Sequence, residues 1–209
     1  MNAKAIFLFS LALVFIGFSP LRGQSLEDSL YNGLDRTILI VRLPSQEKKM
    51  QAIKATIADP ELSESARARL QAQLESVQME TKLKNLAILE AFDENFDAMP
   101  IGFVYDTTRN VYRTDLLNRQ LEVTESVDIP GKVIQLRFGR PVLYSGSRAE
   151  SMVLTDSELT DLGHPFPKPV LMTGFGYGFN KILAPETAFE KLLEKRVKKL
   201  NRKLEELFL

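Results

Sequence analysis

A long helical pattern that leads directly into a short apolar strand constrains the fold of this chain more than any other feature. Apolar residues recur at helical spacing through residues 63–95, and the run Met99–Thr107 that follows enters through a proline and passes an acid near its end. An earlier run, Thr37–Leu43, is β-branched and almost continuously apolar, which is typical of a strand buried on both faces of a sheet. Strands separated by helices predict an α/β fold.

The segment between these two strands is predicted to form a long helical hairpin. Ser45 is expected to cap a first helix that runs to about Ala58, and Asp59-Pro60 ends it. Residues 63–95 then form the second, longer helix. Apolar side chains recur on the expected inner faces of both helices: Met50, Ile53, Ile57, Leu70, Leu74, Val77, Leu83, Leu86, Leu89 and Phe92.

The rest of the chain is predicted to complete a mainly parallel or mixed sheet flanked by helices. The polar stretch 108–128 is expected to contain a helical turn at Thr114–Arg119. Asp156 is expected to cap a short helical turn, and Pro185–Leu209 is an amphipathic closing helix whose apolar residues step by four and three. Three further strands are expected, at Lys132–Phe138, Glu150–Thr155 and Val170–Thr173.

The first 23 residues have the layout of a secretory signal peptide. Lys4 provides the positive charge, the 14 residues of Ala5–Phe18 are uncharged and strongly apolar, and cleavage is expected after Gly23. A helix of that length spans about 21 Å, which is short of the roughly 30 Å hydrocarbon core of a membrane. The sequence therefore predicts an exported protein, periplasmic or secreted, with no membrane span after cleavage.

The composition of the remaining chain excludes several classes of function. Removal of 23 of the 209 residues leaves 186, with 25 basic and 27 acidic side chains because Lys4 and Arg22 are lost, so no basic excess favours nucleic acid as a partner. The absence of cysteine excludes disulfides, thiol nucleophiles and thiolate metal sites. With a single histidine, His164, a site built from several histidines is excluded as well.

Asp106 and Asp156 are the candidate functional acids, because each follows a predicted strand. If the two strands are parallel, both carboxylates emerge at one edge of the sheet, close to Thr107 and to Ser45 and Glu47 after the first strand. Two such acids are candidates for holding a divalent cation or for acting as an acid–base pair. The alternative is that each acid caps the turn that follows it. No other cofactor is predicted.

His164 is a weaker candidate for a catalytic base. A glycine precedes it and a proline follows it, which favours an extended surface loop, and no nucleophile is spaced to pair with it. An ordinary loop histidine is the alternative interpretation.

Two features are candidates for contact with a protein partner. In the segment 174–180, glycine alternates with Phe175, Tyr177 and Phe179, which places the three aromatic rings on one face of an extended chain. This spacing does not match a dinucleotide or phosphate loop. The rings belong either to the core or to an interaction surface, and the C-terminal helix either docks on the sheet or contacts a partner.

The second half of the chain contains the block Ala149–Leu159, followed by Asp161-Leu162 and Pro165-Phe166-Pro167. With a first strand like Ile38–Leu43, a phenylalanine-rich strand like Ile101–Asp106 and a closing helix like Val197–Leu207, it resembles an uncharacterised family of exported Bacteroidota proteins. The resemblance implies export and a single α/β domain, and it carries no catalytic residues.

These observations predict an exported, soluble protein with one α/β domain over residues 24–209. The leading interpretation of its function is a non-catalytic periplasmic or secreted binding or accessory protein, because no strong catalytic or cofactor motif is present. The first alternative is a metal- or carboxylate-dependent hydrolase that uses Asp106 and Asp156. The second alternative is a structural subunit of a cell-envelope assembly.

Overall fold

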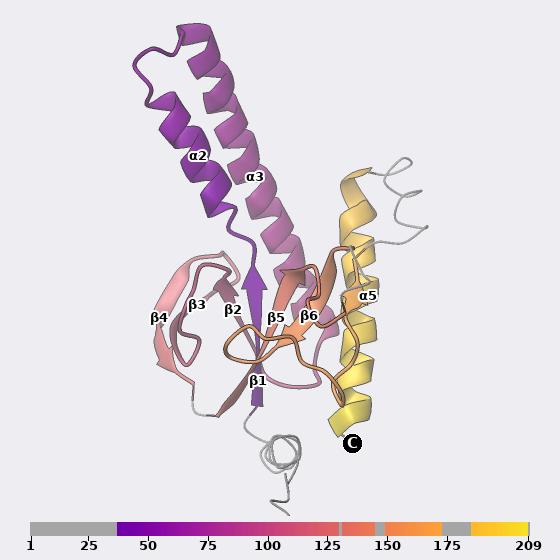
Figure 1. The fold of residues 1–209 in the computed structure, drawn as a ribbon. Coiled ribbons are helices and arrows are strands. Elements are labelled where there is room, and N and C mark those ends of the chain that lie inside the picture. The colour runs from indigo at the N-terminus through magenta and orange to yellow at the C-terminus, as the bar shows by residue number, and fades with distance from the viewer. Residues whose placement is uncertain (1–36, 130, 145–148, 173–184, 209) are drawn as a thin grey trace, which may run out of the picture.

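The structure, a computed structural model, describes residues 37–129, 131–144, 149–172 and 185–208 of the chain. The predicted signal peptide and the aromatic segment 174–180 lie outside these residues. The described elements follow one another as β1 (Thr37–Leu43), α2 (Glu47–Ile57), α3 (Glu64–Asn95), β2 (Ile101–Tyr105), β3 (Arg113–Leu117), β4 (Val123–Asp128), β5 (Lys132–Gly139), β6 (Ser151–Thr155), β7 (Val170–Leu171) and α5 (Pro185–Phe208) (Figure 1).

The main sheet has five strands in the order β2-β1-β5-β6-β7. β1 lies at its centre and pairs in parallel with both β2 and β5, whereas β6 and β7 run antiparallel to their neighbours. The predicted α/β class with a mixed sheet is therefore confirmed, as are the long helical hairpin after the first strand and the closing helix.

Both faces of this sheet are covered, which explains the continuous apolarity of β1. Leu39, Val41 and Leu43 point toward α3 and α5, where they pack with the buried side chains of those helices. Ile40 points to the other face and packs with Val104 of β2 and with residues of the following segment. A strand at the centre of a doubly covered sheet has no solvent-facing side, so apolar residues occupy successive positions.

The second face is covered by an antiparallel hairpin, β3–β4, in place of the predicted helical turn at 114–119. Leu116 of this hairpin packs directly over β2. A Cβ atom on Gly102 would lie 3.0 Å from Ile40 Cδ1 and 3.2 Å from Leu116 Cδ2, so this close approach requires a residue without a side chain. The sequence did not predict the hairpin because its two strands, RTDLL and VTESVD, are short and largely polar.

The helical hairpin α2–α3 extends beyond the sheet (Figure 1). Ile53, Leu74 and Val77 form a small core of their own between the two helices, with Met50, Ile57 and Leu70 packed around it. Two details differ from expectation. The N-cap of α2 is Gln46, at φ 54°, one residue after Ser45. Leu83, which was expected on the inner face of α3, is 59% exposed and therefore lies on its outer face.

α5 packs along α3 and the sheet through Leu193, Val197, Leu200 and Leu204, all fully buried. Its Asn201 fastens the end of α3, because Oδ1 accepts hydrogen bonds from the N–H groups of Asp97 and Ala98 at 3.0 and 2.9 Å. The apolar stripe that the sequence shows is thus used for docking within the chain.

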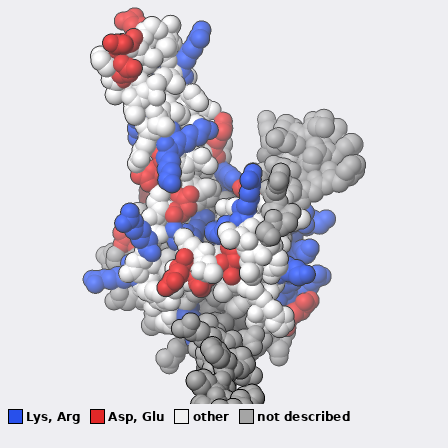
Figure 2. Space-filling model, viewed as in Figure 1, with Lys and Arg blue, Asp and Glu red and all other residues white. Residues whose placement is uncertain are grey.

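Within the described part of the chain, no helix is both long enough and apolar enough to cross a membrane. Figure 2 shows basic and acidic side chains interspersed over the helical hairpin and the sheet body on the face in view.

Candidate functional site

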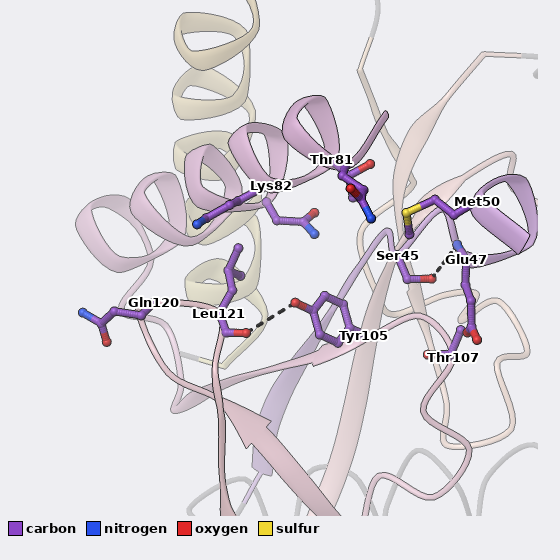
Figure 3. A pocket seen from close by; sticks show the side chains of 11 residues that line it. Ser45, Glu47, Met50, Thr81, Lys82, Tyr105, Thr107, Gln120 and Leu121 are labelled. Carbon is purple, nitrogen blue, oxygen red and sulfur yellow. Dashed lines mark hydrogen bonds between the residues drawn. The ribbon is translucent and has the colours of Figure 1, made fainter. Parts of the chain in front are cut away.

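A cavity of about 500 Å³ lies at the carboxyl ends of β1 and β2. Ser45 and Glu47, just after β1, line one side of it, and Tyr105 and Thr107 line it at the end of β2 (Figure 3). The remaining walls come from Met50 of α2, from α3 and from the turn after β3. Three of the residues that the sequence placed near one sheet edge, Ser45, Glu47 and Thr107, therefore do come together.

The two chain connections beside this cavity leave for opposite faces of the sheet. After β1 the chain enters α2 and α3, whose Ile88 and Phe92 pack on one face. After β2 it enters the β3–β4 hairpin, whose Leu116 packs on the other face. A divergence of this kind at the carboxyl ends of parallel strands opens a crevice, and open α/β sheets bind their ligands in such crevices.

α3 presents a polar stripe to the cavity. Gln78, Lys82 and Asn85 are spaced by four and three residues, so they lie on one side of the helix, and all three line the cavity. Thr81 lines it too, although its hydroxyl donates back to the carbonyl of Val77 at 2.6 Å. Thr81 and Asn85 interrupt an otherwise apolar series of inward positions on this helix, whereas Gln78 and Lys82 are exposed.

Asn85 is the most unusual member of the stripe, because it is only 1% exposed and its hydrogen bonding is incomplete. Its Nδ2 donates to the carbonyl of Pro44 at 3.0 Å, whereas its Oδ1 has no hydrogen-bond partner among the residues that the structure describes. The carbonyl of Pro44 can only accept, which fixes the orientation of the amide. A buried acceptor without a partner costs about 1–3 kcal/mol, so a ligand or water that supplies a donor here is favoured.

Two side chains of opposite charge line the cavity, Lys82 and Glu47. Lys82 is exposed, and no described residue forms an ion pair with it. Glu47 is exposed as well, and its carboxylate accepts a hydrogen bond from Gln51 Nε2 at 2.7 Å. Figure 3 shows the two at opposite ends of the cavity, with Tyr105 between them.

The turn that forms the wall opposite α3 is held by its own hydrogen bonds. Asn118 Oδ1 accepts from the N–H groups of Gln120 and Glu122, both at 2.9 Å. Tyr105 adds a long hydrogen bond of 3.4 Å from its hydroxyl to the carbonyl of Leu121. This wall is therefore positioned before any ligand enters.

A buried arginine lies next to the cavity and ties the strand ends together. Arg42 is 5% exposed and donates to Gln135 Oε1 at 2.7 Å and to the carbonyls of Asp106 and Thr108 at 2.6 and 2.7 Å. Burial lowers the pKa of Arg42, and the nearby Asp106 carboxylate opposes this shift. Gln135 in turn donates to the carbonyl of Asp156 at 2.8 Å. The network links β1, β2, β5 and the end of β6.

The structure does not bring the carboxylates of Asp106 and Asp156 to one edge of the sheet. β6 runs antiparallel to β5, so Asp156 leaves the sheet in the direction opposite to Asp106. Asp106 Oδ1 accepts from the N–H of Ser45 at 3.0 Å. Asp156 Oδ1 accepts from the N–H groups of Glu158 and Thr160, both at 2.9 Å, in a tight turn in place of the expected helical turn.

His164 is an exposed loop residue in the cis His164-Pro165 segment. Among the residues that the structure describes, no group of three or more histidine, aspartate or glutamate side chains is arranged to hold a metal ion. The aromatic residues Phe175, Tyr177 and Phe179 lie outside the described ranges.

Asp161, for which the sequence predicted no role, is held in place by an ion pair and hydrogen bonds. The side chain of Asp161 is 2% exposed, forms an ion pair with Arg137, and accepts hydrogen bonds from the N–H groups of Val142 and Leu143. Burial alone would raise the pKa of Asp161, but the hydrogen bonds from Leu143, Arg137 and Val142 outweigh it and leave that pKa below its ordinary value. This acid fixes the loop after β5.

Comparison with known proteins gives no relative from which a function can be transferred: the chain matches no protein-family model, no curated protein and no solved structure.

The sequence contains a signal for Asn85, although Asn85 was not among the predicted site residues. The inward positions of α3 read Leu74, Val77, Thr81, Asn85 and Ile88, so two polar residues stand where the periodicity calls for apolar ones. A buried polar residue in an apolar stripe indicates a special role. Only the packing, however, shows that Asn85 lies in a cavity and lacks one partner.

Proposed function

We propose that this chain is an exported, non-catalytic binding protein that holds a small polar ligand in the cavity at the carboxyl ends of β1 and β2. The observation that carries the proposal is Asn85, a buried residue that lines the cavity and whose Oδ1 has no hydrogen-bond partner among the described residues. Native proteins pair nearly all buried polar groups, so an unpaired one at a ligand-sized crevice favours a ligand that completes it.

The arrangement of the candidate acids favours binding over the alternative of a hydrolase that uses Asp106 and Asp156. Both carboxylates accept backbone N–H groups, as capping residues do, and they leave the sheet in opposite directions. A cation or acid–base site would require them to converge. The alternative of an envelope subunit has less support from α5, because the apolar face of that helix is packed inside the fold.

Ligand binding can be tested by thermal melting of the purified protein with panels of amino acids, short peptides, sugars and nucleosides. A ligand present at 100 times its Kd stabilises the folded state by about 2.7 kcal/mol, which for a chain of this size raises the midpoint by roughly 5–10 °C. Gln78→Trp places an indole at the cavity and should abolish the shift. Gln73→Trp, on an exposed part of the same helix, is the matched control. If no class of compound shifts the wild-type midpoint, the proposal is wrong.

Export is a separate part of the proposal and has its own test. The full chain is expressed in a Gram-negative host, the cells are fractionated, and the N-terminus is determined by mass spectrometry. We expect a periplasmic or secreted protein that begins at Gln24, because residues 1–23 have the layout of a signal peptide. A cytosolic protein that retains Lys4 would contradict export. Membership in the exported Bacteroidota family stays a prediction.

A further inference from the structure

We infer that the ligand of this cavity is a zwitterion of the size of a short peptide, bound with its anionic end at Lys82 and its cationic end at Glu47. The inference rests on the proposed function, because it names a ligand class for the same cavity. The volume of about 500 Å³ lies within the range of about 300–1,000 Å³ that small-molecule sites occupy.

The unpaired oxygen of Asn85 requires a hydrogen-bond donor. Its Nδ2 is already used by the carbonyl of Pro44, so the side chain offers the ligand an acceptor and nothing else. An amide N–H of a peptide meets this demand, as does an ammonium group. An aliphatic carboxylate or a phosphate without a bound proton does not, because it has no donor.

The two charged side chains give the two ends of the cavity opposite charge. Lys82 and Glu47 stand at opposite ends of it (Figure 3), and no hydrogen bond or ion pair links them. Lys82 has no described ion-pair partner, so an anionic group of a ligand can use it without breaking an existing contact. The carboxylate of Glu47 repels an anion at the other end and attracts a cation there.

The stretch between the charges is partly apolar. Met50, Tyr105 and Leu121 are half-buried and line the cavity between its ends. An apolar side chain of a ligand would be removed from water against them, which is favourable in proportion to the area covered. A positive end, a backbone N–H, an apolar middle and a negative end are together the chemistry of a short peptide with free termini.

The test is titration calorimetry of the full-length purified protein with three forms of one probe. The forms are the tripeptide Ala-Leu-Ala with free ends, its C-terminal amide and its N-acetylated form. We expect the free peptide to bind most tightly and each cap to weaken binding by about threefold to fivefold, the size of a solvent-exposed charge contact. Raising the salt concentration should reduce the difference between the three forms.

Variants locate each end of the peptide. In Lys82→Met the C-terminal amide and the free peptide should bind equally, and in Glu47→Gln the acetylated and free forms should bind equally. Lys54→Met, an exposed change elsewhere in the hairpin, should keep both differences. Asn85→Leu should weaken all three forms by about tenfold or more, because it removes the acceptor.

The outcomes separate this inference from the proposed function. If the peptide binds but the effects of its caps are unchanged in Lys82→Met and Glu47→Gln, the assigned orientation is wrong. If tripeptides do not bind while another compound class does, and Gln78→Trp blocks that class, the ligand class is wrong and the proposed function stands. If no compound class binds, both fail together.

Discussion

Two asparagines, Asn201 on α5 and Asn85 on α3, differ in how completely their side chains are hydrogen-bonded. Asn201 of α5 is fully used: its oxygen accepts two backbone N–H groups after α3, and its Nδ2 donates to Asp97 and to Glu205. Asn85 of α3 is more deeply buried, yet its oxygen has no partner in the described part of the chain. The first joins two elements of the fold. The second has a side-chain oxygen that receives no hydrogen bond from the described residues of the fold.

The difference separates polar groups that hold the structure from the one that we assign to a ligand. Arg42 and Asp161 belong with Asn201, because each spends its hydrogen bonds on neighbouring segments of the chain. Removing such a group leaves its partners unpaired and destabilises the protein. Asn85 differs because its Oδ1 has no partner to lose among the described residues, so its removal breaks only the hydrogen bond from Nδ2 to the carbonyl of Pro44. Replacement of a residue at a binding site often stabilises a protein.

The largest effect is expected for Arg42→Met. This change leaves Gln135 Oε1 and the carbonyls of Asp106 and Thr108 without their donor. We expect a loss of about 3 kcal/mol or more in the free energy of unfolding, measured by urea denaturation. The control is Arg69→Met, at an exposed position of α3, which should stay within about 0.5 kcal/mol of wild type. Equal effects of the two changes would mean that Arg42 is not one of the polar groups that stabilise the fold.

A smaller loss, about 2 kcal/mol at neutral pH, is expected for Asp161→Asn, because the charge-assisted hydrogen bonds of this carboxylate are lost. The folded protein lowers the pKa of Asp161, so its contribution is present above the unfolded pKa of about 3.9 and is lost as the pH falls through the lower, folded value.

Urea denaturation between pH 7 and pH 2.5 checks this, and the wild type and the variant should converge at the acid end. Asp93→Asn is the matched control, since the Asp93–Arg119 pair is exposed and is expected to contribute less than about 1 kcal/mol. A difference between wild type and Asp161→Asn that does not change with pH would contradict the assigned role of the charge.

The two asparagines are compared directly by Asn201→Leu and Asn85→Leu. The first should destabilise by about 1–2 kcal/mol, because two N–H groups lose their acceptor. The second should stabilise by about 1 kcal/mol, because it removes an unpaired buried oxygen and adds apolar burial while losing one hydrogen bond to Pro44. Thermal melting distinguishes the two. Destabilisation by Asn85→Leu as large as that by Asn201→Leu would make Asn85 a structural residue.

The smallest effect is expected for Asp106→Asn and Asp156→Asn. Asparagine caps turns about as well as aspartate, so each melting midpoint should stay within about 2 °C of wild type. A rise of several degrees in either variant would mean that a repelled charge had been removed, which is how an acid poised for a cation or for catalysis behaves. Such a rise would favour the hydrolase over the binding protein.

The sequence predicted more of the fold than of the site. The helical hairpin and α5 were predicted because their apolar residues repeat at helical spacing. β1 was predicted because its short apolar run is continuous and rich in β-branched residues. The β3–β4 hairpin was missed because its strands are polar and short, and the end of β2 was correctly placed beside Ser45 and Glu47. Asp106 and Asp156 were expected together only on the condition of parallel strands, and β6 does not meet that condition.

By itself the sequence determined the α/β class, the length of the helical hairpin and the apolar face of the last helix, because these follow from contacts between residues three, four or two positions apart. The tertiary structure alone decided the direction of β6, the packing of β3–β4 over Gly102 and the burial of Asn85 beside a cavity. Each of these depends on which distant segments meet, and a hydrogen bond left unmade is visible only when every neighbour of the group is in place.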